Sequence, residues 1–139
     1  MCHPHGMGNP PSDLPELSGL LLSLAPRQRR EALVLAGHKA NFGHSVCAAG
    51  VISLALSTLT LQHGVVPVHL GVVDLVPILE KAQESMFLPV QRPMKLNEPA
   101  GEVWYGSVSG TSVSGDNVHL VLKQLLDADE SVSELETLN

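Results

Sequence analysis

The stretch HKANFGHSVCAAGVISLALSTLTLQHGVVP, residues 38–67, decides how the rest of the chain must fold. It belongs to a longer run, from Ala40 to Val73, that contains no Asp, Glu, Lys or Arg. Residues 45–62 are apolar or small on every side, and Gly64 follows at the position expected of a helix C-cap. A helix that is hydrophobic all round is either a membrane span or the centre of a larger protein.

The composition of this helix favours a protein interior over a membrane. Its length, roughly 18 residues, is near the lower limit for a span. It carries five Ser or Thr side chains and a glycine, histidines flank it, and no positive charge marks one end. We therefore expect a buried helix over residues 45–63 and no membrane partner.

The overall composition bounds the class of protein. The 139 residues suffice for one domain, and because 44% are hydrophobic but only 3% aromatic, aliphatic side chains must fill the core. The net charge of −6 argues against a nucleic-acid partner, since phosphate backbones require clustered Lys and Arg. We interpret the basic cluster at Arg27-Gln28-Arg29-Arg30 as a solvated helix end.

Cysteine usage and the N-terminus indicate the compartment. Cys2 and Cys47 are too few for a disulfide framework. The opening residues resemble neither a signal peptide nor a transit peptide, so we expect a cytoplasmic location.

Periodicity and turn residues predict the other elements. Leucines recur at helical spacing behind Asp13, which we take as the N-cap, with Glu16 at capping-box distance. Before the central helix we expect a Gly/Pro-rich loop over 1–12, this helix up to Pro26, a buried strand over 32–37 and a loop over 38–44. After the central helix we expect an irregular segment over 64–101 with a short helix at 74–85, and then a hairpin of strands at 103–109 and 117–123. The tail over 127–139 has five carboxylates and no basic residue, which is typical of a flexible linker.

Three loops place histidine next to glycine or asparagine: His5-Gly6, Asn41-Phe42-Gly43-His44 and Asn117-Val118-His119. Helix N-termini and glycine turns suit developing negative charge, to which a histidine can donate a hydrogen bond. Lys39 could hold charge nearby. Taken singly, each histidine also fits a structural role, and we expect His119 to be a satisfied core residue of its strand. His38, His63 and His69 show no partner pattern.

Taken in order, four motifs resemble those of the β-ketoacyl synthases, the condensing enzymes of fatty-acid and polyketide synthesis. The first motif is His5-Gly6-Met7-Gly8-Asn9 with Asp13 and Glu16, where the family has His-Gly-Thr-Gly-Thr and Gly-Asp-Pro-x-Glu. The second is Lys39-Ala40-Asn41-Phe42-Gly43-His44, where the family has Lys-Ser-Asn-Ile-Gly-His, and the third is His63-Gly64-Val65-Val66-Pro67, where it has His-Gly-Val-x-Pro. The fourth runs from Val108 to His119, where the family has Val-Ser-Ser-Phe-Gly-Phe-Gly-Gly-Thr-Asn-Ala-His. The resemblance covers residues 3–123.

This resemblance implies an α/β, thiolase-like fold with two similar halves, each a mixed sheet, and buried helices between them. Residues 1–126 would be an incomplete C-terminal half, and 127–139 an acidic tail. The charge-free helix would be a central one. An isolated chain would leave sheet edges and this helix poorly covered. The implied partners are the missing N-terminal half, a second copy in a homodimer, and an acyl carrier protein.

The resemblance also implies a chemistry. In the family a malonyl-type extender loses carbon dioxide, and its enolate attacks an acyl thioester on a cysteine. His5 and His44 would donate hydrogen bonds to the thioester enolate, and Lys39 would act through charge or positioning. No cofactor is implied beyond the phosphopantetheine arm of the carrier protein, and no metal.

Two further groups of residues take roles from the resemblance. The loop 110–116 would lend a backbone N–H to the oxyanion hole and gate the acyl pocket, and its residues include Val113, in place of a Phe, with Ser114, Gly115 and the following Asn117. The motif-supporting residues would be Gly6, Gly8, Asp13, Glu16, Asn41 and Gly43.

Several departures leave alternatives open. The family's catalytic cysteine is upstream of anything here, and Cys47 matches an alanine, so we do not expect it to be a nucleophile. Val46 replaces a glutamate, Met7 and Asn9 replace threonines, and the gating loop lacks both phenylalanines. The chain could thus be part of a condensing enzyme, inactive alone, or a divergent non-catalytic scaffold. A metal module built on Cys2, His3 and His5 lacks zinc-site spacing.

Overall fold

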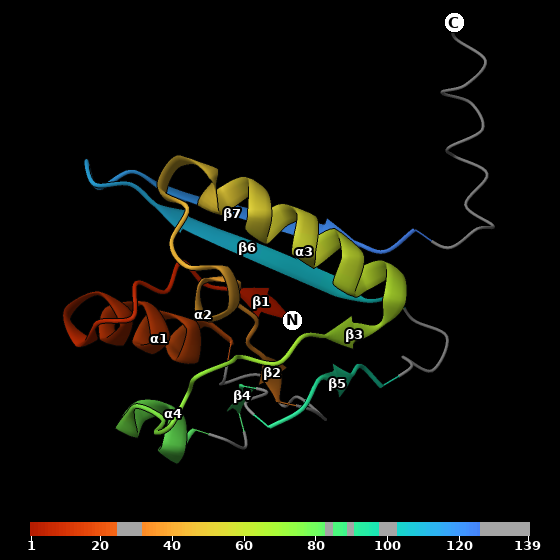
Figure 1. Ribbon diagram of the computed structural model, residues 1–139, viewed down its shortest axis with the longest axis horizontal. Coiled ribbons are helices and arrows are strands. Elements are labelled where there is room, and N and C mark those ends of the chain that lie inside the picture. Colours follow the sequence, from red (N-terminus) through yellow and green to blue (C-terminus); the bar gives the residue numbers. More distant parts are fainter. Residues whose placement is uncertain (25–31, 83–84, 89–90, 98–102, 126–139) are drawn as a thin grey trace, which may run out of the picture.

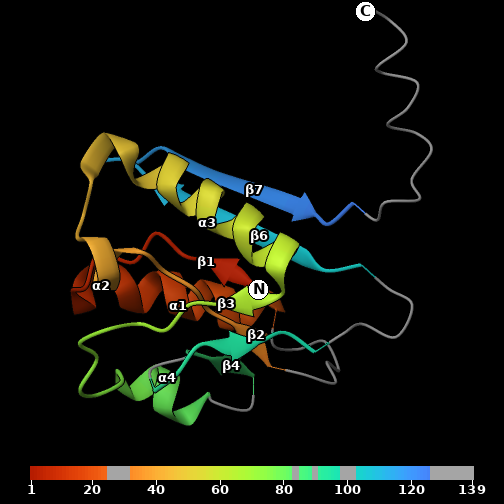
Figure 2. The ribbon, with the colours of Figure 1, turned by 45° about the vertical axis from the view of Figure 1, so that its right-hand side comes forward.

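The computed structural model describes residues 1–24, 32–82, 85–88, 91–97 and 103–125, and it is an α/β arrangement (Figures 1 and 2). Its elements in order are β1 (Cys2–His3), α1 (Pro10–Leu24), β2 (Leu33–Val34), α2 (Lys39–Phe42), the 3-10 helix η1 (Val46–Ala48), α3 (Ala49–His63), β3 (Val65–Val66), α4 (Pro77–Lys81), β4 (Met86–Phe87), β5 (Met94–Lys95), β6 (Tyr105–Thr111) and β7 (Asn117–Lys123).

The largest sheet has the order β1-β6-β7 and is mixed, as the resemblance implied. β1 is parallel to β6, whereas β6 and β7 are antiparallel, with Tyr105 opposite Lys123 and Thr111 opposite Asn117. The predicted hairpin is therefore confirmed. Two smaller pairs, parallel β2-β4 and antiparallel β3-β5, lie on the other side of β1 from the hairpin (Figures 1 and 2).

Helix α3 lies along the hairpin and packs mainly on β6 (Figures 1 and 2). Small and hydroxyl-bearing side chains dominate its buried face, which consists of Ala49, Ser53, Ser57, Thr60 and Leu61. A Cβ on Gly106 of β6 would lie 3.4 Å from Leu61, so the absence of a side chain there permits the close approach. The predicted helix is present, and its first turn is 3-10.

The opposite face of α3 is exposed, with Val51 at 69% and Leu59 at 49% exposure. This agrees with the expectation that the chain alone covers the helix poorly. Within the described residues, Val46–His63 is a stretch long and apolar enough to cross a membrane by length and composition, but the same criteria fit a core helix. Because α3 packs on β6 through side chains with buried hydroxyl groups, we interpret it as a core helix rather than a membrane span.

Helix α3 ends at the predicted C-cap. Gly64 has φ +65°, and its N–H donates to the Thr60 carbonyl over 2.8 Å. A Cβ at Gly64 would lie 2.7 Å from the Trp104 ring, so glycine is required both by the left-handed backbone and by the indole.

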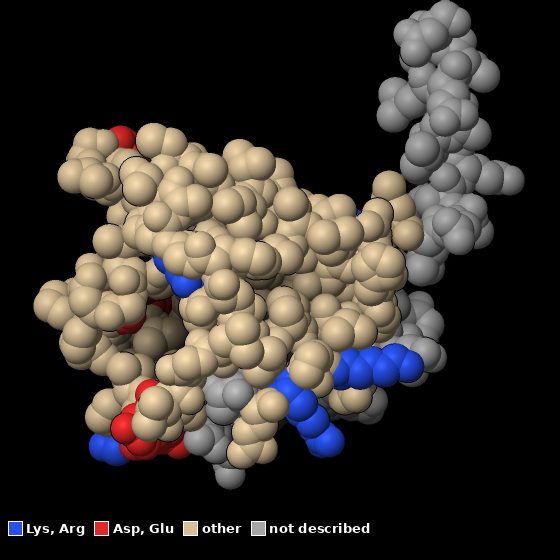
Figure 3. Space-filling view, viewed as in Figure 1, with Lys and Arg blue, Asp and Glu red and all other residues tan. Residues whose placement is uncertain are grey.

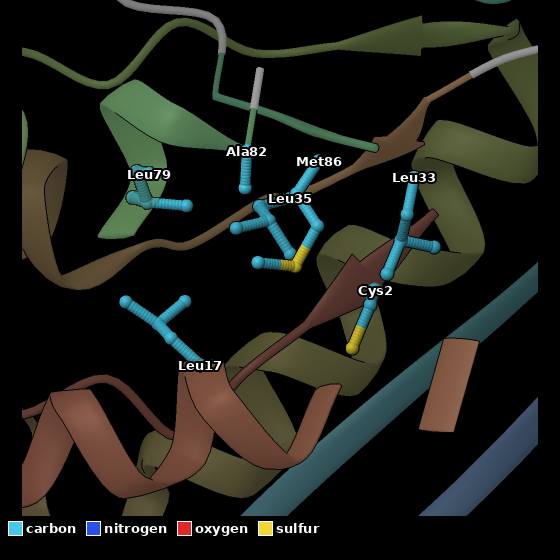
Figure 4. Close-up of a cluster of buried hydrophobic side chains, with 7 residues drawn as sticks. All are labelled: Cys2, Leu17, Leu33, Leu35, Leu79, Ala82 and Met86. Atoms are coloured by element: carbon cyan, nitrogen blue, oxygen red, sulfur yellow. The ribbon is translucent and has the colours of Figure 1, made fainter. Parts of the chain in front are cut away.

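The main apolar core lies between α1, α4 and the short strands (Figure 4). Its buried members are Cys2, Leu17, Leu33, Leu35, Leu79, Ala82 and Met86. Residues 33–36 are all buried, so the expected buried strand is confirmed, although regular pairing is limited to Leu33 and Val34. Ala36 continues the contact by donating its N–H to the Cys2 carbonyl over 2.8 Å.

Three expectations about loops were wrong. Cys2 and His3 form a strand rather than part of a loop, and Lys39–Phe42 form a helical turn within the expected loop 38–44. Within its described residues, the segment 64–101 holds three two-residue strands, and the helix there is Pro77–Lys81. Elements this short carry no detectable periodicity, because partners distant in sequence, not the local pattern, define them.

The first helix begins earlier than expected. It starts at Pro10, and Asn9 rather than Asp13 caps it, since Asn9 Oδ1 accepts the Ser12 N–H over 3.1 Å. It is described as far as Leu24, and the expected stop at Pro26 lies outside the described residues. The interpretations of Arg27–Arg30 and of the tail 127–139 fall outside the described residues.

Candidate functional site

A cavity of about 550 Å³ opens beside α1 and α2, on the face that is visibly hollowed in Figure 3. Its lining combines polar groups with an apolar wall. The polar lining includes His5, Asp13, Glu16, Lys39 and His44, and the apolar wall includes Leu17, Leu35, Leu75, Val76, Leu79 and Leu88. Gly6 and Gly8 also line it, so most of the residues singled out in the first two motifs meet at one cavity.

The two motif histidines are in contact although they come from separate loops. The rings of His5 and His44 lie edge to face, with centroids 6.0 Å apart and planes at 80°. His5 follows β1, and His44 lies between α2 and η1. The fold thus brings together the two imidazoles that the sequence singled out.

Backbone N–H groups define the tautomer of both rings. The Thr111 N–H donates to His5 Nδ1 over 3.3 Å, and the Val46 N–H donates to His44 Nδ1 over 3.1 Å. Because an accepting Nδ1 carries no proton, a neutral ring must carry its proton on Nε2. Both imidazoles are therefore Nε2–H donors, and that of His5 faces the Met7 thioether sulfur at 3.1 Å.

Electrostatics keep the first of these rings neutral. Partial burial lowers the pKa of His5, and the nearby Lys39 cation lowers it further, while Glu16 acts in the opposite direction. A neutral His5 can donate a hydrogen bond near pH 7 without first losing a proton.

Two carboxylates of α1 hold the loop that carries His5. Glu16 accepts the N–H of His5 through Oε1 at 2.6 Å and the N–H of Gly6 through Oε2 at 2.9 Å. Asp13 Oδ1 accepts the Met7 N–H at 2.7 Å. Gly6 has φ +52°, a conformation that glycine adopts without strain. The capping-box interpretation of Asp13 and Glu16 was therefore wrong, because these carboxylates satisfy the loop's N–H groups instead.

Lys39 closes the same loop from the opposite side. Its Nζ donates to the carbonyl oxygen of His5, so it contacts the first histidine through the backbone. Burial lowers the pKa of Lys39, and Glu16 and Asp13 counteract this shift. The lysine thus supplies a half-buried positive charge at the cavity and fixes the position of His5.

Asn41 and Gly43 support the second motif from outside the cavity lining. Asn41 donates through Nδ2 to the Val68 carbonyl at 2.8 Å and accepts the Leu70 N–H at 2.9 Å. Gly43 has φ +80° and ends α2. Both residues shape the backbone around Lys39 and His44.

The four residues singled out in and after the predicted gating loop do not line the cavity, although Thr111 of that loop contacts His5. Val113, Ser114, Gly115 and Asn117 are exposed, and none is among the described residues that line the cavity. The loop folds around Asp116, whose Oδ2 accepts from Ser114 at 2.5 Å and from Ser112 at 3.0 Å. These hydrogen bonds lower the pKa of Asp116. The structure therefore does not place these four residues with His5 and His44.

Other candidates have simpler environments. Cys47 is exposed, and Cys2 is buried with its pKa raised by that burial. His119 was expected in the core, which was wrong: it is exposed on β7, where its Nδ1 lies 2.8 Å from Ser109 Oγ. Among the residues with described placement, no group of three His, Cys, Asp or Glu side chains could hold a metal ion.

Sequence reasoning missed two residues that touch His5. Met7 was noted as a substitution but not as a contact of the imidazole, and Thr111 was noted as part of the loop but not as the donor to Nδ1. Spacing gave a signal for Met7, two residues from His5. For Thr111 there was none, because its contact depends on β1 and β6 being neighbours.

Comparisons with known proteins agree with the motifs. The family described as β-ketoacyl synthase, C-terminal domain, matches residues 1–73. A mycocerosic acid synthase-like polyketide synthase of Mycolicibacterium smegmatis is 35% identical over 132 residues, which are 94% of this chain and 6% of that protein. The highly reducing polyketide synthase apmlA of Arthrinium phaeospermum is 32% identical over 120 residues, which are 86% of this chain and 5% of that protein.

Solved structures share the fold. The ketosynthase from module 6 of the bacillaene synthase from Bacillus subtilis 168 superposes with a TM-score of 0.81 at 21% identity, over 90% of this chain and 22% of that one. Ketosynthase twelve of the bacillaene polyketide synthase in Bacillus amyloliquefaciens gives a TM-score of 0.80 at 21% identity, over 91% and 22%. The thiolase-like, partial ketosynthase fold implied by the motifs is confirmed.

Proposed function

This chain belongs to the β-ketoacyl synthase C-terminal domain family, and we propose from that premise that it supplies the two-histidine part of a condensing active site. The cysteine nucleophile would come from the N-terminal half of a ketosynthase, in the same polypeptide or a partner. The substrate would be a malonyl-type thioester carried on the phosphopantetheine arm of an acyl carrier protein.

The edge-to-face contact of His5 and His44 carries this proposal. Because both rings have their protons on Nε2, two neutral donors can converge on one acceptor that takes the place of the Met7 sulfur at His5 Nε2. An acceptor that gains charge in the transition state benefits most from donors already in place, since they need no reorganisation. The carbonyl oxygen of a thioester that becomes an enolate is such an acceptor.

The proposed reaction uses each group in turn. The bond between the extender's carboxylate carbon and its α-carbon breaks, carbon dioxide leaves, and the electron pair forms the enolate. The Nε2–H groups of His5 and His44 hold the enolate oxygen. The α-carbon then attacks the acyl thioester on the partner half's cysteine, and the cysteine leaves as a thiolate. Lys39 holds the backbone of His5 throughout and adds positive charge beside the developing anion.

A non-catalytic scaffold is the second candidate, and one observation favours it. The loop that would shape the acyl pocket is exposed, and Val113 within it is fully exposed. Its side chains form hydrogen bonds with the carboxylate of the loop's own Asp116. A chain that had kept the histidines but lost the gate would still present the surfaces of a ketosynthase to a homodimer partner and a carrier protein.

The decisive experiment co-expresses this chain with a ketosynthase N-terminal half and measures both carbon dioxide release from a malonyl carrier protein and formation of the condensed product. We expect both activities in the unmodified pair. His44→Ala should abolish them, whereas His63→Ala, a change at an exposed histidine of α3, should not. A pair that assembles yet releases no carbon dioxide above the His44→Ala background would overturn the enzymatic proposal in favour of the scaffold.

A further inference from the structure

Three histidines that no motif explains are buried at the site, and two of them, His38 and His69, also line its cavity. His3 of β1 is 0% exposed, His38 just before α2 is 1% exposed, and His69 after β3 is 7% exposed. They come from three segments distant in sequence, and the side chains of His38 and His69 are both close enough to act electrostatically on His3. Buried imidazoles in this number require an explanation, because each must remain uncharged to avoid the cost of desolvation.

The cluster is poorly prepared to accept protons. Within the described part of the chain, both ring nitrogens of His3 and the Nε2 atom of His38 lack a hydrogen-bond partner. The other ring nitrogen of His38, Nδ1, lies 3.1 Å from Ser53 Oγ on α3. Besides the other two histidines, the charged groups facing His3 are the N-terminal ammonium and Lys39, and those facing His38 are Lys39 and His44. All of these disfavour a further positive charge.

Burial and these neighbours lower the pKa of His3 to about 4, and burial also lowers the pKa of His38. The sign of the effect on stability follows. The unfolded chain takes up these protons at a higher pH than the folded chain, so folding is favoured fully above the ordinary histidine pKa of about 6.5 and is progressively disfavoured as the pH falls from there towards 4.

Each member of the cluster is joined to a segment that builds the site. His3 precedes His5 by two residues on β1 and its continuation, and His38 is the neighbour of Lys39. His69 lies between Val68 and Leu70, whose backbone groups form hydrogen bonds with the Asn41 side chain. A Cβ on Gly37 would lie 3.1 Å from His69 Nε2, so the His69 ring packs directly against the backbone that leads into His38.

We propose that His3 and His38, with the His69 ring packed against Gly37, form an acid-sensitive switch that holds the site together when neutral and separates its segments when the two rings take up protons. Neutral rings pack β1, the start of α2 and the segment after β3 against each other. Protonated rings at His3 and His38 would repel each other and seek water, which would draw β1 away from residues 35–38 and move His5 from His44. The regulatory meaning of this switch rests on the proposed function, whereas the switch itself is a property of the chain.

The test is an acid titration of the full chain, followed by amide and histidine ring resonances. We expect loss of the contacts of Cys2 with Leu35 and Ala36 as the pH falls from about 6.5 to about 4, full recovery on return to neutral pH, and uptake of protons by His3 in the same step as that loss. His3→Phe, which keeps a ring but cannot titrate, should shift the midpoint by about one pH unit towards acid. The matched control His63→Gln, at an exposed position, should leave the midpoint unchanged.

Three outcomes would overturn the switch. His3 could take up a proton while the contacts of Cys2 with Leu35 and Ala36 persist, or His3→Phe could share the midpoint of the unmodified chain. If His3→Phe fails to fold, the titration of the unmodified chain still decides through the first criterion. Stabilisation at neutral pH by added Zn²⁺, absent in His3→Phe, would show a metal-ligand set instead. None of these readouts requires condensing activity, so failure of the proposed function and failure of the switch are distinguishable.

Discussion

Two glycine-containing loops, residues 5–9 and 112–116, resemble each other in composition but differ in what holds them. In both, carboxylate oxygens receive hydrogen bonds from the loop. In the first, the carboxylates of Asp13 and Glu16 belong to α1, which packs into the core through Leu17. In the second, the carboxylate is the loop's own Asp116. The rest of the fold therefore imposes the shape of the first loop, whereas the second is determined by its own hydrogen bonds.

This difference separates two parts of the proposed site. The histidine part is preorganised within the chain, because α1, Lys39 and two backbone N–H groups fix the rings of His5 and His44. The gating part touches the histidines through the Thr111 N–H alone among the contacts of the described residues, at the end of β6. Changes to the first loop's anchors should thus disturb the site, and changes to the second should not.

The largest effect is expected from Glu16→Ala. The change removes the acceptor of two backbone N–H groups, those of His5 and Gly6. Because both bonds are charge-assisted and partly buried, we expect a loss of about 2–3 kcal/mol in the free energy of unfolding. Urea denaturation measures it, and Glu80→Ala, at an exposed position of α4, is the control. A loss no larger than that of the control would show that the first loop is not anchored by α1.

A smaller effect is expected from Lys39→Met. The His5 carbonyl loses its donor, which should cost about 1 kcal/mol in the free energy of unfolding because the lysine is half-exposed. Since the Lys39 cation lowers the pKa of His5, its removal should raise that pKa. Ring resonances of His5 across a pH series measure the shift, with Lys81→Met as the control. An unchanged His5 titration would contradict the electrostatic role.

The smallest effect is expected from Asp116→Ala. The loop should lose its internal hydrogen bonds, so the amides of residues 112–116 should exchange faster with solvent. The unfolding midpoint and the ring resonances of His5 should stay as they are. The same loosening should appear in the unmodified chain as the pH falls through the depressed pKa of Asp116, because the carboxylate then loses its charge. A shift in the ring resonances of His5 on Asp116→Ala would show that the two loops are coupled, and it would contradict the difference between them.

The sequence predicted those elements that carry a strong local pattern. Helix α3, its Gly64 cap, the hairpin of β6 and β7 and the buried run at residues 33–36 were all anticipated, because composition or alternation marks them. The two-residue strands β1, β3, β4 and β5 were not, since each is defined by a partner elsewhere in the chain.

Prediction of the site shows the same limit. The order of the motifs was sufficient to single out His5, His44 and Lys39, which the fold places at one cavity. It misjudged Asp13 and Glu16, because a spacing of three residues fits a capping box as well as a pair of anchors for a preceding loop. It gave no signal for the cluster of His3, His38 and His69, which exists only once three segments have folded together.

The central claim is that this chain alone presents two neutral imidazoles with their protons on Nε2 to a common acceptor. Long-range nitrogen–proton correlation spectra of the histidine rings at neutral pH test it directly, before and after addition of a malonyl thioester of pantetheine. We predict Nε2–H tautomers for His5 and His44 and a joint shift of both rings on addition of the thioester. A ring that carries its proton on Nδ1, or a shift confined to one of the two histidines, would contradict the account.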